Sequence, residues 1–143
     1  MKINSIQPYL FFDGRCEEAI EFYRKTLGAE VTMLLRFKDS PEAPKSGCQP
    51  PVGSENKIMH ASLQIGASTI LASDGRCGGN PKFEGFSLSL TVPNEAEAER
   101  QFKALSEGGT VEMPLGKTFF SPSFGVVTDR FDVSWMVYVL PSA

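Results

Sequence analysis

The feature that most constrains this chain is an internal repeat. When the sequence is shifted by 80 residues against itself, at least six residues of the first half meet an identical residue of the second half without a gap. These pairs include Leu10 and Leu90, Glu17 and Glu97, Phe22 and Phe102, Gly28 and Gly108, Val31 and Val111, and Met33 and Met113. Such a repeat predicts two copies of one supersecondary unit, in about residues 1–80 and 81–143.

Local patterns predict the same order of elements in each copy. Strands are expected where apolar residues alternate or cluster between turn residues, and helices where they recur at helical spacing. In the first copy this gives a helix at 15–27, which Gly28 ends, and strands at 5–12, 31–37, 58–65 and 69–73. In the second copy it gives a helix at 95–106, with Asn94 as N-cap, and strands at 86–92, 111–115, 124–128 and 135–140. Each copy is therefore expected to be a βαβββ unit.

The number of helices limits how these units fold. One helix covers one face of a four-stranded sheet and leaves the other bare, so the bare faces of the two copies are expected to meet. With 143 residues, 41% of them hydrophobic, the chain has the size and the core of a single domain. We expect an α+β fold in which a curved eight-stranded mixed sheet surrounds a cavity and the helices lie outside.

Composition excludes several kinds of partner. There are 14 Lys and Arg residues against 17 Asp and Glu, and no basic cluster stands out, so no nucleic acid is expected. No apolar run approaches the roughly 20 residues of a spanning helix, so we expect a cytoplasmic protein without membrane contact. Cys16, Cys48 and Cys77 form no CxxC pair, which argues against a disulfide framework or a zinc ribbon. Cys16 is either a small residue at a helix start or a thiol activated by the helix dipole.

Alternation along the expected strands selects residues for the cavity. Side chains at every second position share a face, so apolar residues are expected under the helices and polar ones inside. The 80-residue shift pairs Gln7 with Ser87, so the face of the first strand that carries Gln7 is also expected to face the cavity. By the same alternation, Trp135 of the last strand is expected to face the cavity. The predicted cavity residues are Gln7, Tyr9, Phe11, His60, Ser62, Gln64, Ser87, Ser89 and Trp135.

Longer motifs carry a resemblance to a known superfamily. A tandem βαβββ chain with FFDGRCEEAIEFYRKTLGAE in the first copy and VTDRFDVSWMVYVL at the end resembles the vicinal oxygen chelate superfamily, which includes glyoxalase I, fosfomycin-resistance proteins and extradiol dioxygenases. PYLFFDGRCEEAIEFY, MHASLQI, SDG and VTDRFDVSWM are similar to segments of its PhnB-like branch. The resemblance covers essentially the whole chain. It implies a small-molecule ligand and a homodimer, and it adds Phe119 and Phe120 to the cavity.

The same resemblance makes a specific statement about metal. Metal enzymes of the superfamily hold a divalent cation, which acts as a Lewis acid, with His, Gln or Glu from the first and last strands of each half. The corresponding positions here are Gln7, Ser87, Val137 and one near Leu71 or Ala72, and only Gln7 is of a ligand type. We therefore expect no cofactor, and a divalent metal ion only if Gln7 and His60 share it.

Two functions stay open. One is metal-free binding of a small molecule in a cavity whose metal site is degenerate. The other is a metal-assisted or His60-dependent enzyme of the lyase, isomerase, dioxygenase or resistance type, acting on a small oxygenated metabolite. In that case His60 is a base or a proton shuttle, whereas otherwise its ring only orients Ser62 or Gln64.

Three further features have open interpretations. Arg36 is either a solvated surface residue or a contact for a ligand carboxylate or phosphonate. Residues 38–57 are rich in Pro and Gly and are expected to form a lid, a dimer arm or a passive insert. Related sequences are often labelled demethylubiquinone methyltransferases, but the chain has no GxGxxG segment for S-adenosylmethionine, so methyl transfer is not expected.

Overall fold

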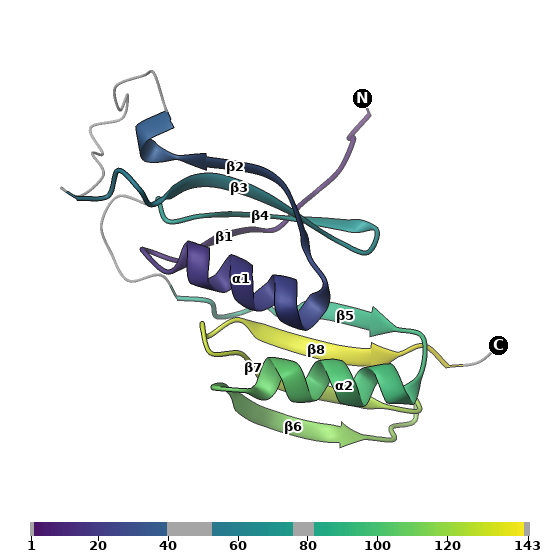
Figure 1. Cartoon of the computed structure of the whole chain (residues 1–143). Coiled ribbons are helices and arrows are strands. Elements are labelled where there is room, and N and C mark those ends of the chain that lie inside the picture. The colour runs from purple at the N-terminus through teal and green to yellow at the C-terminus, as the bar shows by residue number, and fades with distance from the viewer. Residues whose placement is uncertain (1, 40–52, 76–81, 142–143) are drawn as a thin grey trace. The chain divides into compact units, whose positions relative to one another are not determined.

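The chain divides into two compact units, Met1–Pro81 and Lys82–Ala143 (Figure 1). The structure is a computed structural model that describes residues 2–39, 53–75 and 82–141. Most of the expected loop at 38–57, together with Cys48 and Cys77, lies outside these ranges.

The first unit has the predicted βαβββ order. Its strands run in the order β1-β4-β3-β2, with β1 parallel to β4 and the other pairs antiparallel. Strand β1 is shorter than the predicted 5–12 because it is an edge strand and Pro8, just before it, has no N–H to donate. The elements are β1 (Tyr9–Phe11), α1 (Cys16–Leu27), β2 (Glu30–Arg36), the 3-10 helix η1 (Phe37–Asp39), β3 (Ile58–Ile65) and β4 (Ser68–Ser73).

The second unit repeats this arrangement. Its sheet has the order β5-β8-β7-β6, again with one parallel pair, β5 with β8. The elements are β5 (Leu88–Val92), α2 (Glu95–Ser106), β6 (Thr110–Gly116), β7 (Phe124–Thr128) and β8 (Ser134–Val139). The α+β class and the tandem βαβββ order are thus confirmed, with the eight strands in two four-stranded mixed sheets.

The helices begin and end where the sequence indicates. The Asn94 side chain accepts a hydrogen bond from the backbone N–H of Glu97 at 2.9 Å, which caps α2 as predicted. Gly28 ends α1 in the left-handed conformation, with φ of 67°, which glycine adopts without strain. The predicted helix boundaries are therefore confirmed to within one residue.

One face of each sheet packs against the helix of its own unit. In the first unit α1 buries Ala19, Ile20 and Tyr23, and Ala61 and Leu63 of β3 are also buried. In the second unit α2 lies along the sheet (Figure 1) and packs against its strands. We call the opposite side of each sheet its helix-free face.

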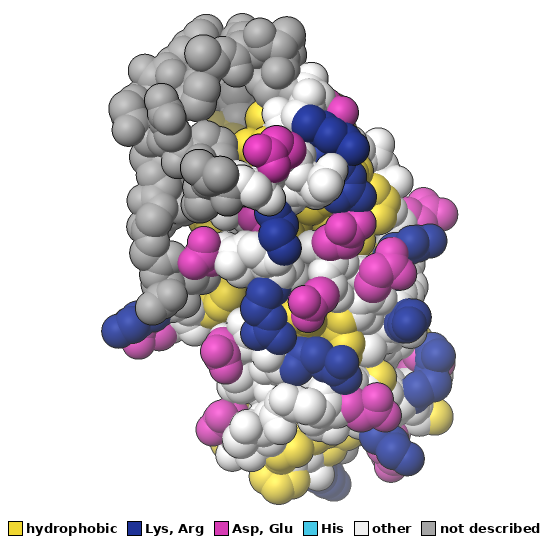
Figure 2. Space-filling view, turned by 60° about the vertical axis from the view of Figure 1, so that its left-hand side comes forward, with side chains coloured by type: hydrophobic (Ala, Val, Ile, Leu, Met, Phe, Trp, Pro, Cys, Tyr) yellow, Lys and Arg dark blue, Asp and Glu magenta, His cyan; other side chains and the backbone are white. Residues whose placement is uncertain are grey.

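The described surface carries both signs of charge. On the face shown in Figure 2, Lys and Arg side chains are interspersed with Asp and Glu side chains. Neither of the two described helices is long and apolar enough to cross a membrane. The expectations that nucleic acid and membranes are not partners stay predictions.

Candidate functional site

The helix-free face of the first sheet brings together residues from all four strands. The register pairs Tyr9 with Leu71, Leu71 with Ser62, and Ser62 with Met33, and paired residues share a face. Phe11 lies two residues after Tyr9 in β1, and His60 lies two residues before Ser62 in β3, so both side chains lie on the same face. Tyr9, Phe11, His60 and Ser62 therefore share one face, as the alternation predicts.

A hydrogen bond between Tyr9 and His60 is the main polar contact on this face. The Tyr9 hydroxyl lies 2.8 Å from Nδ1 of His60, and their ring centroids are 5.5 Å apart. The Phe11 ring stacks on Tyr9 with a centroid distance of 4.8 Å and an interplanar angle of 22°. Tyr9 is 37% exposed, so this aromatic group is not core. The three side chains form a small polar and aromatic cluster that a ligand can reach.

Tyr9 keeps its proton in this setting. Burial raises the pKa of the Tyr9 phenol above its ordinary value, the nearby Ser73 side chain lowers it by less, and the nearby Cys16 raises it further. A phenol with a raised pKa is neutral at physiological pH. Tyr9 is therefore a hydrogen-bonding group here and not a phenolate base.

The other predicted cavity residues are more scattered. Gln64 lies at the far end of β3, where its amide donates to the carbonyl oxygen of Gly66 at 3.4 Å. Gln7 is exposed and precedes β1. Ser87 and Ser89 belong to the second unit, where the Ser87 hydroxyl lies 2.6 Å from that of Ser134.

The prediction that Trp135 lines a cavity is wrong. Its Nε1–H donates to Oδ2 of Asp129 at 2.8 Å, and the side chain is only 2% exposed. The register of β8 pairs Trp135 with Leu88 and Val127, which lie on the helix-covered face. Val137, the position matched to a metal ligand, is on this same covered face and fully buried.

An aromatic cluster occupies the helix-free face of the second sheet instead. Phe120 stacks on Tyr138 with an interplanar angle of 25° and meets Phe124 edge to face at a centroid distance of 5.1 Å. Phe119 meets Phe120 edge to face at 5.2 Å and is fully exposed. Phe124 and Tyr138 are not among the residues predicted from the sequence, and the register that pairs them places both on this face.

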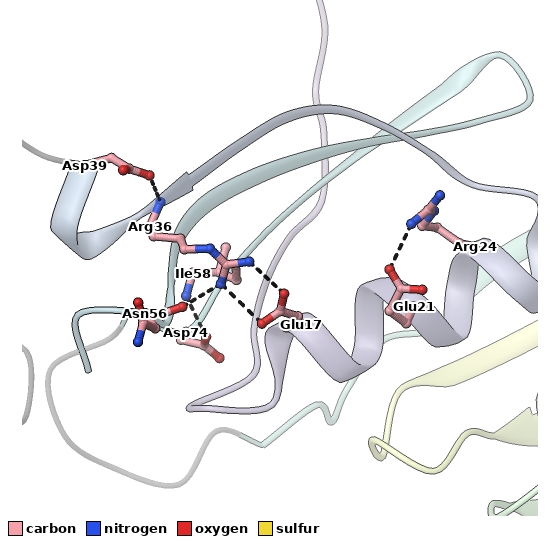
Figure 3. A network of polar contacts seen from close by, with 8 residues as sticks. All are labelled: Glu17, Glu21, Arg24, Arg36, Asp39, Asn56, Ile58 and Asp74. Atoms are coloured by element: carbon pink, nitrogen blue, oxygen red, sulfur yellow. Dashed lines mark hydrogen bonds and ion pairs between the residues drawn. The ribbon is translucent and has the colours of Figure 1, made fainter. Parts of the chain in front are cut away.

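The Asp74 carboxylate links three backbone positions of the first unit by hydrogen bonds. It accepts hydrogen bonds from the backbone N–H groups of Gly14, Cys16 and Ile58 at 2.7, 2.8 and 2.9 Å, and Figure 3 shows the bond to Ile58. It therefore holds the start of α1 against the start of β3. Burial, and next the negative charge of Asp74, raise the pKa of the Cys16 thiol far above its usual range, so the interpretation of Cys16 as an activated nucleophile is wrong.

Arg36 is occupied by an ion pair with α1. Its two terminal nitrogens reach the Glu17 carboxylate at 3.2 and 2.7 Å, and one of them also donates to the carbonyl oxygen of Asn56 (Figure 3). The positive charge of the guanidinium is therefore paired with Glu17 at the start of α1. Its interpretation as a contact for an anionic ligand therefore loses its basis.

The donor groups of the helix-free face do not fit a divalent metal ion. A durable site needs at least three ligands of suitable type. In residues 2–39, 53–75 and 82–141 no group of three or more His, Cys, Asp or Glu side chains could hold a metal ion. One ring nitrogen of His60 is already engaged with Tyr9, and the family positions at Leu71 and Val137 carry aliphatic side chains.

The fold and the helix-free faces define the class of protein. Two βαβββ units, each with one helix on a four-stranded mixed sheet, are the fold of the vicinal oxygen chelate superfamily, which includes glyoxalase/bleomycin resistance/dioxygenase domains. More narrowly, the chain belongs to the PhnB-like family, whose family model carries the description 3-demethylubiquinone-9 3-methyltransferase and matches residues 4–138.

Three relatives illustrate this membership. Protein YjdN from Escherichia coli K12 is 38% identical over 142 residues, which cover 94% of this chain and 95% of YjdN. The crystal structure of protein PA1353 from Pseudomonas aeruginosa is 45% identical, covers 96% of this chain and 100% of its own, and has a TM-score of 0.82. The structure of a PhnB protein from Bacillus cereus is 27% identical with a TM-score of 0.74, covering 95% of this chain and 99% of its own.

Proposed function

We propose that this chain binds a small molecule on the helix-free face of the first sheet. The observation that carries the proposal is the Tyr9–His60 hydrogen bond, with Phe11 stacked beside it on a partly exposed surface. The hydrogen bond orients the imidazole, so its other nitrogen is presented in a fixed direction. A face that combines flat rings with one oriented polar group is the usual composition of a small-molecule site.

The expected contributions are modest and can be separated. A ring stacked on Phe11 or Tyr9 contributes about 0.5–1.5 kcal/mol beyond its buried area. A neutral hydrogen bond to His60 contributes about 0.5–1.5 kcal/mol net. Removing the Tyr9 hydroxyl frees the imidazole to rotate, so it weakens binding without removing a ring.

A ligand screen with matched variants tests the proposal. We would follow binding by two-dimensional NMR in wild type, Tyr9→Phe, His60→Ala and Tyr138→Phe. Tyr138→Phe makes the same chemical change on the second sheet and should leave binding intact. Metabolites that shift the signals of Tyr9, Phe11 and His60, and bind more weakly to the first two variants, support the site. Hits whose shifts avoid these residues contradict it.

An enzyme that uses His60 as a general acid or base is the second candidate. The same Tyr9–His60 contact favours it, because an imidazole held by a second group is the arrangement of many catalytic bases. Product formation from a bound metabolite, lost in His60→Ala, would favour this candidate over binding alone. Methyl transfer is no part of the proposal, since the sequence lacks the glycine-rich loop for S-adenosylmethionine.

We also propose that the protein is a cytoplasmic homodimer. Strand β2 is a sheet edge on which Val31, Met33 and Leu35 are 37–50% exposed, and such an edge favours pairing with another chain. The buried free thiol of Cys16 suits a reducing compartment. Analytical ultracentrifugation should give a mass of twice 15.6 kDa for wild type. Met33→Lys should lower the measured mass, because it places a charge on the exposed edge strand. A wild-type mass of 15.6 kDa at micromolar concentration would overturn the dimer.

A further inference from the structure

Two exposed aliphatic side chains lie beside the aromatic and polar cluster of the first sheet. Leu35 of β2 pairs with His60, and Met33 pairs with Ser62, so both side chains lie on the helix-free face. Residues paired across two strands have their Cβ atoms about 5 Å apart, so Leu35 is a direct neighbour of His60. Leu35 and Met33 are 38% and 50% exposed. We call these two side chains the β2 strip.

The sheet order places the β2 strip opposite the aromatic rings. In the order β1-β4-β3-β2, the first and last strands form the two edges (Figure 1). Tyr9 and Phe11 lie on β1, and His60 lies on β3. With about 4.8 Å between neighbouring strands, the face spans about 14 Å from the rings to the strip. A molecule on this face therefore meets flat rings, then the hydrogen-bonded polar atoms of Tyr9 and His60, and then aliphatic side chains.

The second sheet has the same methionine without the polar group. Met113 is 48% exposed and pairs with Val126. Phe124, two residues before Val126 in β7, stands where the first sheet has His60. The order of ring, polar group and aliphatic strip is therefore a feature of the first sheet, and Met113 is a matched control for Met33.

From this arrangement we infer that the site takes a molecule in which a flat ring and an aliphatic chain are joined by a hydrogen-bonding group. The inference rests on the proposed function and adds the class of ligand. The ring stacks on Tyr9 and Phe11, the joining group bonds to His60, and the chain covers the β2 strip. An aliphatic chain suits the strip because it removes apolar surface from water on both partners. A second copy that pairs with the backbone of β2 would extend the sheet and leave the strip on this face.

N-methylbenzamide and N-butylbenzamide test this order of groups. Both carry a phenyl ring and an amide, which donates and accepts hydrogen bonds and so suits either ring nitrogen of His60. A butyl chain is long enough to cross the single strand spacing from β3 to β2, about 4.8 Å, and a methyl group is not. A fully buried CH₂ group strengthens binding about fourfold. Three more of them, half covered on an open face, should give N-butylbenzamide an advantage of about fivefold to tenfold.

Two-dimensional NMR titrations of matched variants locate the aliphatic chain. Leu35→Ser should cut the advantage of N-butylbenzamide to about twofold or less, and Met33→Ser should at least halve it. N-methylbenzamide should bind both variants as it binds wild type. Met113→Ser makes the same change at a similar exposure in the second sheet and should keep the full advantage. Spectra without probe show which variants fold, and Met33→Ser decides the matter if Leu35→Ser does not.

The outcomes separate this inference from the proposed function. Equal affinities of the two probes for wild type, or a full advantage in the serine variants of the β2 strip, would overturn the inference. So would an advantage that Met113→Ser removes. The proposed site would stand in these cases if the probes still shifted the signals of Tyr9, Phe11 and His60. If both probes shifted only signals of the second sheet, the proposed function would fall as well.

Discussion

Removing the carboxylate of Asp74 should destabilise the first unit more than any other change of an acidic residue in it. The side chain is 8% exposed and accepts three backbone hydrogen bonds of 2.7–2.9 Å. Two of the donors, the N–H groups of Gly14 and Cys16, lie at the start of α1, where helix N–H groups have no partner within the helix. Arg15, at the N-cap position, makes no side-chain capping bond, so Asp74 caps α1 from another part of the chain.

The size of the effect follows from these bonds. Asp74→Ala leaves three N–H groups without their acceptor, at about 1–3 kcal/mol for each group that water cannot reach. Water can reach the partly buried Gly14 N–H more easily than the other two. We therefore expect a loss of about 3–5 kcal/mol in the free energy of unfolding. Asp74→Asn keeps one carbonyl oxygen but turns an NH₂ group toward a backbone N–H. We therefore expect it to lower the free energy of unfolding by about 2–3 kcal/mol.

Urea unfolding followed by far-ultraviolet circular dichroism measures both losses. Asp39→Ala is the matched control, because Asp39 accepts one exposed backbone hydrogen bond, from the Arg36 N–H at 2.9 Å, and should cost at most about 1 kcal/mol. A loss below about 1 kcal/mol for Asp74→Ala, or equal losses for the two alanine variants, would refute the argument that Asp74 caps α1.

Three further outcomes are expected. The hydrogen bond with Arg36 lowers the pKa of Glu17 from its ordinary 4.5. The pair therefore stabilises the fold above that pH, and its contribution is lost as the pH falls through the lowered pKa. The free energies of unfolding of wild type and Glu17→Gln should differ at neutral pH and converge at acidic pH. Trp135→Phe leaves a buried Asp129 oxygen without its donor and should cost about 2–4 kcal/mol by circular dichroism, whereas a cost below 1 kcal/mol would contradict the role of that bond. Plasma mass spectrometry of tag-free protein should find no stoichiometric divalent metal, and one metal per chain that His60→Ala removes would contradict the degenerate site.

The sequence predicts the elements well wherever local signals agree. Helix α2 has a capping Asn94 before it and Gly108 after it, and the predicted range of 95–106 matches the structure. Strand β3 alternates between buried and more exposed residues, and its predicted range of 58–65 also matches. The first strand is predicted too long because its apolar residues continue before Pro8, beyond the last residue that can pair with β4.

The faces of β8 could not be predicted in the same way. Its sequence, SWMVYV, is apolar at nearly every position, so alternation does not show which side packs on the helix. The register with β5 and the hydrogen bond from Trp135 to Asp129 decide the matter, and both depend on residues distant in the sequence. The contact of Tyr9 with His60 has a similar origin, since β4 lies between their strands and sets the register of each.

The two copies of the repeat show which part of the site is shared and which is specific to the first unit. The 80-residue shift matches Tyr9 to Ser89, and the strand registers of the two sheets match Leu71 to Met136, Ser62 to Val126, Ser73 to Tyr138 and His60 to Phe124. Met33 and Met113, which pair with Ser62 and Val126, keep this match consistent at the opposite edge of each sheet.

At the positions of Tyr9, Ser73 and His60, the second unit therefore carries Ser89, Tyr138 and Phe124. The phenylalanine cannot accept or donate a hydrogen bond, and in this unit aromatic rings pack together where the first unit has the Tyr9–His60 hydrogen bond. A purely structural need of the fold would act on both copies, because their sheets have the same strand order and register. The fold forms without the equivalent of the Tyr9–His60 hydrogen bond in one copy, so the fold itself does not require this contact, which is consistent with the proposed binding role of the first unit.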